Sequence, residues 1–444
     1  MQFSRARNFL VVLALILVSA TSVYFIFKNQ PAWADKNVVA VLDSLAINDN
    51  VQQLADSIPL PPPPPPEKLS NPPEIIKAVY VTAYSAGAKT YLSYLKNLFK
   101  NTEVNAVVVD IKGSDGYVAY ASGAEEVKKY NLTNLAIKNI DELVRFFHDQ
   151  NVYVIGRVAV FEDPQYAKAR PELAVYNKAK TLRDASGQAN LSQPVLWRDN
   201  NGLAWLDPNS KDVWDYNVSL AKDAFYHGFD EINFDYIRYP SDGNTKNMGF
   251  PFLDEKMVAS ETIKEFFHYL RISLPNEKIS ADLFGLTTIN TDDMGIGQII
   301  EDAFENFDYV CPMVYPSHYA NGFRGFVNPA EHPYEVIKYS MESALLREKK
   351  LIKSQQDLAM KNSEPAGSPA ASLQEVTDIM DPVLLTRIRP WLQDFNMGAF
   401  YTAEMVRQEI KATQDSLGDS YSGFMLWNPS NIYTQGAVLK NHPE

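Results

Sequence analysis

Two short β-like runs in the middle of the chain carry aspartates, and these aspartates are the residues best suited to chemistry. In residues 231–237, Asn233 and Asp235 alternate with apolar side chains, and Asp282 alternates with them in residues 278–283. Successive strand residues point to opposite faces, so an apolar face packed on helices turns both aspartates inward. Paired carboxyl groups can cleave a glycosidic bond, with Asp235 as nucleophile or base and Asp282 as proton donor.

Arginines near these runs offer a second explanation for the two carboxyl groups. Charged side chains rarely occupy a core without a partner. Arg157 in an earlier run and Arg238 just after Asp235 are the candidate partners. A structural ion network that closes the top of the fold is therefore the alternative to a catalytic pair. Glu162 and Asp394 follow two other runs and are reserve acids.

A saccharide site also needs aromatic faces for stacking and polar groups that bond hydroxyls. Residues of both kinds gather where the β-like runs end. The expected substrate-binding residues are Tyr84, Asp110, Lys112, Arg157, Glu162, Asn233, Arg238, Tyr315, His318, Asp394, Trp427 and Asn428. Cys311 shares a face with Met313 and Tyr315, and we interpret it as an inert packing thiol.

Eight runs of β-branched and aromatic residues supply the elements that would position these side chains. They cover residues 77–83, 105–111, 152–160, 231–237, 278–283, 309–315, 388–394 and 423–427. Helical patterns separate most of them, clearly at residues 90–99, 140–150, 211–226, 255–270, 333–348 and 403–416. This alternation predicts an α/β fold, a closed parallel (β/α)8 TIM barrel, over residues 75–440. No Gly-x-Gly-x-x-Gly follows the first run, which argues against a dinucleotide-binding sheet.

Two long connections carry the residues beyond the ~250 that such barrels typically need. Residues 161–210 include Trp197 and Trp205, and we expect this aromatic-rich loop to line a cleft. Residues 349–380 have few aromatic side chains and low hydrophobicity. We expect that segment to be mobile and peripheral.

The first 34 residues have the pattern of an export signal or an N-terminal membrane anchor. Arg5 and Arg7 precede an apolar stretch at residues 9–27, and residues 32–34 also read as an A-x-A cleavage site. The two outcomes stay open, and in both the positive-inside bias places the remainder outside the cytoplasm. Residues 35–74 then combine an amphipathic helical pattern with six consecutive prolines at 61–66, which predicts an extended linker.

Composition narrows the classes of partner. The 444 residues are 46% hydrophobic and 21% charged, which favours a folded chain over a disordered or multi-span membrane one. A formal net charge of −13 is a poor match for nucleic acid. A single cysteine and six scattered histidines give no metal-binding spacing, so we expect no metal and no cofactor. The expected partner is a polysaccharide or oligosaccharide, with a membrane contact only if the N-terminal segment is uncleaved.

Several segments together resemble a family of bacterial extracytoplasmic barrels described as "putative glycosyl hydrolases". The segments that carry the resemblance are residues 80–87, 109–112, 228–240, 280–285, 313–319, 389–395 and 426–428. The resemblance implies a (β/α)8 glycosidase-like fold that acts on a polysaccharide, over nearly all of residues 77–433.

The fourth run also resembles, more distantly, the fourth-strand motif of family 18 chitinases. That motif places acidic residues at alternate positions and ends in a catalytic glutamate. Ile237 stands at the glutamate position here, and an aliphatic side chain cannot donate a proton. The resemblance therefore implies kinship of barrels, and Asp235 is the last carboxylate of the run.

Two other functions remain open on the sequence. One is a non-catalytic carbohydrate-binding barrel whose carboxylates accept hydrogen bonds from hydroxyl groups. The other is a structural protein of the cell envelope, in which the predicted helix at residues 38–58 drives oligomerisation and the barrel is a scaffold. Product release from a bound glycan separates the first from a hydrolase, and a filled cavity at the strand ends would favour the second.

Overall fold

The computed structural model describes residues 64–183, 187–254, 256–363 and 387–440. Residues 65–444 form one compact unit. The predicted export segment, the amphipathic pattern and the first prolines of the linker lie outside the described residues, so these predictions stay predictions. Within the described ranges, no helix is both long enough and apolar enough to span a membrane.

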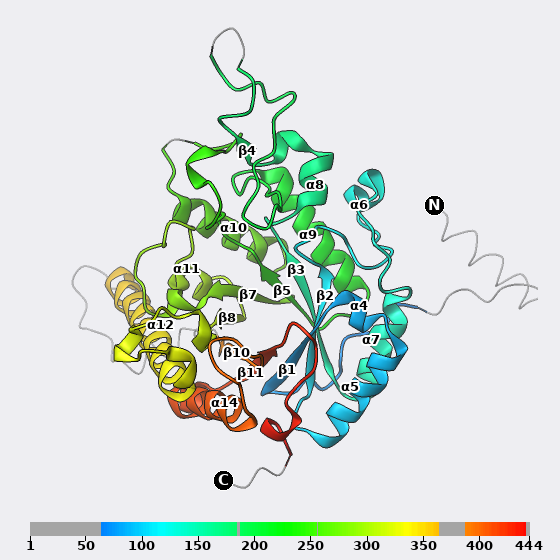
Figure 1. The fold of residues 1–444 in the computed structure, drawn as a ribbon, viewed down its shortest axis with the longest axis vertical. Helices are drawn as coiled ribbons and strands as arrows, with labels where there is room; N and C mark the ends of the chain where they lie inside the picture. The colour runs from blue at the N-terminus through cyan, green and yellow to red at the C-terminus, as the bar shows by residue number, and fades with distance from the viewer. Residues whose placement is uncertain (1–63, 184–186, 255, 364–386, 441–444) are drawn as a thin grey trace, which may run out of the picture. The chain divides into compact units, whose positions relative to one another are not determined.

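Parallel strands close into the predicted (β/α)8 barrel (Figure 1). They follow the order β10-β11-β1-β2-β3-β5-β7-β8-β9, and β10 also pairs with β8, which closes the ring. The strands are β1 (Ile76–Val81), β2 (Ala106–Lys112), β3 (Tyr153–Ala159), β5 (Glu231–Asp235), β7 (Lys278–Phe284), β8 (Tyr309–Met313), β9 (Arg387–Ile388), β10 (Trp391–Gln393) and β11 (Gly423–Trp427). All eight predicted runs are present, and the fold prediction is confirmed.

Helices surround the barrel on its outer face (Figure 1). They are α4 (Ala83–Ala86), α5 (Lys89–Asn101), α6 (Glu125–Tyr130), α7 (Ile140–His148), α8 (Pro164–Ala169), α9 (Lys211–Tyr226), α10 (Ala259–Ser273), α11 (Ile300–Phe304), α12 (Pro333–Ser363) and α14 (Ala403–Leu417). A separate pair of short antiparallel strands, β4 (Tyr176–Asn177) and β6 (Met248–Gly249), joins two of the loops.

Two predicted boundaries were wrong. The seventh run is two short strands, β9 and β10, because Arg389 and Pro390 interrupt it and Pro390 has no amide hydrogen for a strand ladder. The helix predicted to end at residue 348 continues to Ser363, so the first part of the expected mobile segment is helical. The rest of that segment, residues 364–380, lies outside the described residues.

The loop at residues 161–210 does not line a cleft with its tryptophans, contrary to expectation. Trp197 and Trp205 are each 1% exposed and belong to the apolar cluster outside the barrel. The indole N–H of Trp197 donates to the backbone oxygen of Asn244, and that of Trp205 donates to Asp199. The aromatic side chains of this loop therefore extend the main apolar cluster outside the barrel.

Buried apolar side chains form two clusters, one on each side of the strands. The larger lies between strands and helices and includes Ile232 and Phe234. The smaller fills the barrel interior with Ile76, Ala78, Tyr80, Ala106, Val108, Tyr153, Ile155, Tyr309, Cys311, Tyr315, Trp391 and Met425. This division confirms the predicted alternation, and Cys311 is a buried packing thiol.

Strands β5 and β7 contribute polar side chains to that interior, beginning with Glu231. Its carboxylate pairs with the guanidinium of Arg389, and both side chains are 0% exposed. Ser280 donates to the same carboxylate at 2.5 Å, and the Arg389 guanidinium lies 4.0 Å from the centre of the Tyr309 ring. A buried carboxylate is tolerated here because a charge and several donors surround it.

Replacing Arg389 by methionine should strongly destabilise the protein, because Glu231 would keep an unpaired buried charge. We expect the free energy of unfolding to fall by about 3–5 kcal/mol. Urea denaturation followed by tryptophan fluorescence measures it. Lys411→Met, which breaks an exposed ion pair with Asp415, is the matched control and should change little. Equal effects of the two substitutions would contradict this account of the interior.

Candidate active site

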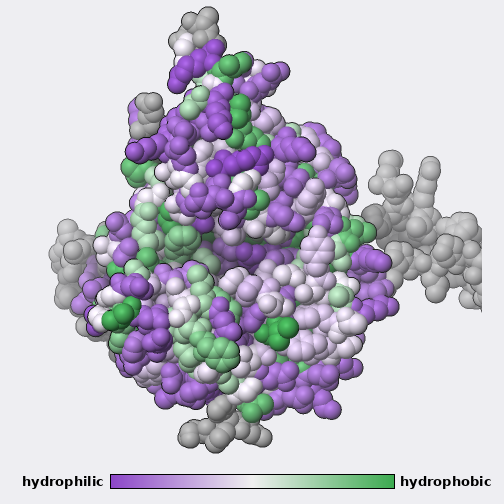
Figure 2. Space-filling view, in the orientation of Figure 1, coloured by the Kyte–Doolittle hydropathy of each residue, from purple (hydrophilic) through white to green (hydrophobic). Residues whose placement is uncertain are grey.

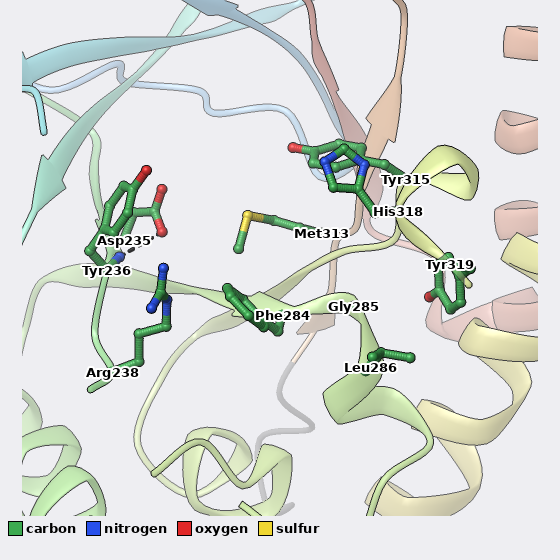
Figure 3. Close-up of a pocket in the computed structure, with 10 residues that line it drawn as sticks. All are labelled: Asp235, Tyr236, Arg238, Phe284, Gly285, Leu286, Met313, Tyr315, His318 and Tyr319. Carbon is green, nitrogen blue, oxygen red and sulfur yellow. Dashed lines mark hydrogen bonds between the residues drawn. The ribbon is translucent and has the colours of Figure 1, made fainter. Parts of the chain in front are cut away.

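A cavity of about 340 Å³ opens at the carboxyl ends of β5, β7 and β8, and we name it the mouth cavity. Its lining residues are Asp235, Tyr236, Arg238, Phe284, Gly285, Leu286, Met313, Tyr315, His318 and Tyr319 (Figure 3). The face of the molecule that carries it is hollowed near its centre, with both hydrophilic and hydrophobic surface around the hollow (Figure 2). Polar and apolar side chains therefore meet in one opening, as in a saccharide site.

Asp235, the last residue of β5, is the carboxylate of the mouth cavity. Its Oδ2 accepts hydrogen bonds from the Nε of Arg157 at 3.1 Å and from the Nη2 of the same guanidinium. Its Oδ1 accepts from the backbone N–H of Tyr236 at 2.6 Å. These donors fix the direction of the carboxylate beside the opening.

Asp282 points into the barrel as predicted but lies below the mouth cavity. It is 1% exposed and is not among the lining residues. Its Oδ1 accepts from Asn233 Nδ2 at 2.8 Å and from Trp391 Nε1 at 2.7 Å. Burial, followed by the charge of Asp235, raises the pKa of Asp282 well above its usual range, which favours the protonated form of this carboxyl.

Arg157 joins three carboxyl groups of neighbouring strands. Besides bonding Asp235, its Nη1 donates to Asp110 Oδ1 at 2.6 Å, and its Nε lies 3.9 Å from Asp282 Oδ2. The hydroxyl of Tyr80 donates to the other oxygen of Asp110. The ion network proposed as the alternative to catalysis is thus present, but Asp235 within it still faces an open cavity.

Tyr236 lines the mouth cavity, although strand alternation placed it toward the helices. The strand ends at Asp235, and Tyr236 has a left-handed backbone conformation with a φ of 53°. That turn takes Tyr236 out of the regular strand alternation, so its side chain lines the cavity while it also packs against the apolar cluster outside the barrel. Arg238 follows and also lines the cavity, with its guanidinium 4.9 Å from the ring centre of the buried Trp205.

Glu162 lies behind this part of the wall. It is 3% exposed, and its Oε2 has no hydrogen-bond partner. Burial raises the pKa of Glu162 to about 8, with a further contribution from Asp199 and partial compensation by Arg238. Glu162 is therefore protonated near neutral pH, and it is absent from the cavity lining.

Aromatic side chains form the opposite wall, near β8, β10 and β11. The ring of Tyr315 lies 5.6 Å from Trp427 and 5.2 Å from His318, and Phe395 lies 4.9 Å from Trp427. Tyr315 and His318 belong to the cavity lining. Burial lowers the pKa of His318, which favours its neutral form. Apolar faces of a sugar ring can stack on such a wall.

The sequence did not single out six of the lining residues as site residues: Tyr236, Phe284, Gly285, Leu286, Met313 and Tyr319. Each lies near or just after the end of a predicted strand, and that position is the signal that could have identified them. A side chain at position 285 would place its Cβ within 2.4 Å of the backbone oxygen of Met313, so this position requires Gly285. The close approach brings the turn after β7 against the end of β8 and shapes the cavity wall.

Several predicted substrate-binding residues have their polar groups engaged elsewhere. Lys112 is 0% exposed and pairs with Asp163 at 2.6 Å, so it cannot reach a ligand. Asp394 accepts from the backbone N–H and the hydroxyl of Thr434. Asn428 donates to the backbone oxygens of Asp394 and Ile432. These three side chains hold loops and strand ends in place.

The remaining predicted residues lie near the cavity but outside its lining. Asn233 is fully buried and bonds Ser280 and Asp282 beneath the cavity. Tyr84 and Asp110 line a separate hollow at the ends of β1 and β2. Among the described residues, no group of three or more His, Cys, Asp or Glu side chains is arranged to hold a metal ion. The acidic groups at the site are thus Asp235 in the cavity lining, with Asp282 and Glu162, whose pKa values burial raises, outside it.

Residues 78–433 match the family model described as "Putative glycosyl hydrolase domain". A hypothetical protein from Ruminiclostridium thermocellum is 40% identical, over 46% of this chain and 96% of its own, with a TM-score of 0.40. The PgaB (BpsB) glycoside hydrolase domain from Bordetella bronchiseptica is 13% identical, over 83% of this chain and 100% of its own, with a TM-score of 0.50. The α-galactosidase TtGalA from Thermus thermophilus is 14% identical, over 84% of this chain and 61% of its own, with a TM-score of 0.42.

The likeness to the Bordetella domain shows the barrel fold alone. No curated protein matches the chain.

The protonated state of Glu162 predicts a measurable pH dependence of stability. Its pKa is about 8 in the folded protein against an ordinary value of 4.5, so the folded state binds the proton more tightly than the unfolded chain. Stability should therefore fall as pH rises between these values. Glu162→Gln should remove this loss and be more stable than wild type above pH 8, by about 5 kcal/mol.

Urea denaturation at a series of pH values tests this, because the two proteins should differ little below about pH 4. The exposed Glu404→Gln provides the control and should follow wild type at every pH. A Glu162→Gln curve parallel to wild type over the whole range would show that this carboxyl ionises normally in the folded state.

Proposed function

Because the chain belongs to the glycosyl hydrolase domain family whose model matches residues 78–433, we propose that it cleaves a saccharide by a two-carboxylate mechanism in the mouth cavity. The observation that carries the proposal is the position of Asp235. Among the described residues lining the cavity, it is the one carboxylate, and Arg157 and a backbone amide direct it to the opening. A saccharide bound there would present its anomeric carbon to this group.

The pairing of Asp235 with Asp282 supports a division of roles. Arg157 Nε lies 3.1 Å from Asp235 Oδ2 and 3.9 Å from Asp282 Oδ2, so these two oxygens lie within about 7 Å of each other. The Arg157 guanidinium bonds Asp235 directly, whereas burial and the charge of Asp235 raise the pKa of Asp282, which favours its protonated form. Environments that separate two neighbouring carboxyl groups in this way mark acid and base assignments.

In the proposed reaction, the Asp235 carboxylate attacks the anomeric carbon or takes a proton from the water that does so. The bond from that carbon to the glycosidic oxygen breaks, and its electron pair stays on the leaving oxygen. Asp282 gives its proton to that oxygen. Because Asp282 lies below the cavity, Glu162, with its pKa of about 8, is the second candidate for the donor.

A non-catalytic saccharide-binding barrel is the competing function, and one observation favours it. Arg157 and the Tyr236 amide already occupy both oxygens of Asp235, as in a purely structural network. In that case saccharides would bind in the mouth cavity and leave unchanged. Incubation with bound glycans and detection of new reducing ends separates the two functions.

The proposed setting is outside the cytoplasm, on a polysaccharide of the cell envelope or matrix, with the chain tethered or secreted. Its support is the Arg5 and Arg7 bias before the apolar stretch at residues 9–27. A protease that cannot cross the membrane should remove the barrel from the outer side of intact cells. Complete protection of the barrel would rule out this setting.

Substituting the carboxyl groups should separate their roles. Asp235→Asn should lower kcat at least a thousandfold on every saccharide, because an amide neither attacks carbon nor accepts a proton. Asp282→Asn should lower kcat by roughly 10²–10⁴-fold on a polysaccharide but little on a dinitrophenyl glycoside, whose leaving group needs no proton. Reducing-end release and dinitrophenol absorbance measure the two reactions.

Asp308→Asn is a matched control, since it weakens an aspartate–arginine pair with Arg271 away from the cavity. It should leave both rates unchanged. If Glu162→Gln, rather than Asp282→Asn, shows the leaving-group dependence, the donor is Glu162. An Asp235→Asn protein that turns over saccharides at the wild-type rate would eliminate the mechanism.

A further inference from the structure

A second hollow of about 220 Å³ opens at the carboxyl ends of β1 and β2, and we name it the β1–β2 hollow. Thr82 and Tyr84 line it after β1, Asp110 near the end of β2, and Asp115 and Asn134 in the following loop. None of the roles proposed for the mouth cavity uses it. In the order of strands, β3 separates these strands from β5, β7 and β8 of the mouth cavity.

One side chain of that intervening strand connects the two openings. Arg157 of β3 donates to Asp110, which lines the β1–β2 hollow, at 2.6 Å. Its Nε donates to Asp235, which lines the mouth cavity, at 3.1 Å. The two openings are therefore neighbours on the rim, separated by a single guanidinium and its two carboxylate partners.

The lining of the β1–β2 hollow suits a sugar ring. Tyr84 is 64% exposed although it is a large aromatic residue, and its hydroxyl accepts a hydrogen bond from Asn134 at 2.5 Å. This bond holds an exposed aromatic face at the edge of the hollow, where a sugar ring can stack. Thr82, Asp110 and Asn134 provide polar groups for hydroxyls.

The charges of the β1–β2 hollow restrict the kind of ring. Asp110 and Asp115 line it, and none of its described lining residues is Lys, Arg or His. Asp110 has a cationic partner in Arg157, whereas Asp115 is exposed and accepts from the backbone N–H of Tyr117. Carboxylates without a lining cation repel an anionic ring, so a uronic acid is disfavoured.

We propose that the β1–β2 hollow binds a second ring of the same saccharide whose neighbouring part occupies the mouth cavity. The substrate is then a neutral chain of several rings that crosses Arg157, and cleavage over Asp235 leaves rings on both sides of the broken bond. The protein acts within chains rather than on a single terminal ring. This inference rests on the proposed function for the bond cleavage but concerns binding, so it can fail separately.

Calorimetric titration of the full-length Asp235→Asn protein tests the inference without turnover. The probes are cellulose, starch and chitin oligosaccharides of one to six rings, with an oligogalacturonate of six rings as the anionic comparison. We expect the affinity for one neutral series to rise with ring number and to exceed that for the oligogalacturonate. Adding Tyr84→Ala should weaken six-ring binding about tenfold and leave one-ring binding unchanged.

Two further variants control for loss of structure. Tyr84→Phe keeps the stacking ring but loses the hydroxyl that accepts from Asn134, so it should weaken six-ring binding less than Tyr84→Ala does. Tyr226→Ala removes a tyrosine of similar exposure, 66%, at the end of α9 and should change nothing. Equal affinity for one and six rings, unaffected by Tyr84→Ala, would overturn the inference even if wild type releases reducing ends. Six-ring oligosaccharides that all fail to bind would overturn it as well, and preferred binding of the oligogalacturonate would overturn the charge argument.

Discussion

The fold depends on arginine side chains that neutralise carboxylates inside the barrel. Placing a charged carboxylate in a protein interior costs several kcal/mol unless a cation and further donors compensate. Strands β5 and β7 bring Glu231, Asp235 and Asp282 to the interior. Arg389 pairs with Glu231, and Arg157 lies beside the two aspartates. The pair of Arg389 and Glu231 is fully buried, whereas the pair of Arg157 and Asp235 lies at the rim of the barrel.

That difference in depth separates a sealed carboxylate from one that faces an open cavity. The Glu231 side chain is fully buried, and Ser280 and Arg389 donate hydrogen bonds to its carboxylate. Asp235 also pairs with an arginine, Arg157, but it is the last residue of its strand. The backbone turns at the next residue, Tyr236, beside the cavity. Asp282 is intermediate between these two: it lies 3.9 Å from Arg157, and burial raises its pKa, which favours its protonated form. Arg157 thus bonds Asp110 and Asp235 directly and leaves Asp282 at a longer distance.

Much of this arrangement could be predicted from the sequence because strand alternation is a strong local constraint. The alternation of Asn233 and Asp235 with Ile232 and Phe234 sufficed to point both polar residues inward. What alternation cannot give is depth along the barrel axis, which depends on the stagger of neighbouring strands. Asp282 therefore appeared equivalent to Asp235, although only Asp235 reaches the cavity.

Other predicted side-chain positions differ from the structure because tertiary contacts, rather than local sequence, determine where these side chains lie. Lys112 ends its strand just as Asp235 does, yet Asp163, which caps α8, draws its ammonium group into a fully buried pair. Trp197 and Trp205 had the composition of a binding loop, but both are buried in the apolar cluster outside the barrel. The left-handed conformation of Tyr236 carries no signal of its own in the residue type.

The two walls of the mouth cavity continue the division of the barrel interior beneath it. Inside the barrel, β5 and β7 are polar, whereas β1, β8, β10 and β11 contribute Ile76, Tyr309, Trp391 and Met425. Above this level the same strands end in Asp235 on one side and in the aromatic group around Tyr315 and Trp427 on the other. A sugar ring has hydroxyls at its edges and apolar faces, so it can engage both walls at once. The buried carboxylates and their arginines are thus separated from the aromatic side chains. The same separation determines which wall of the opening can stack on a sugar ring and which wall presents the carboxylate to it.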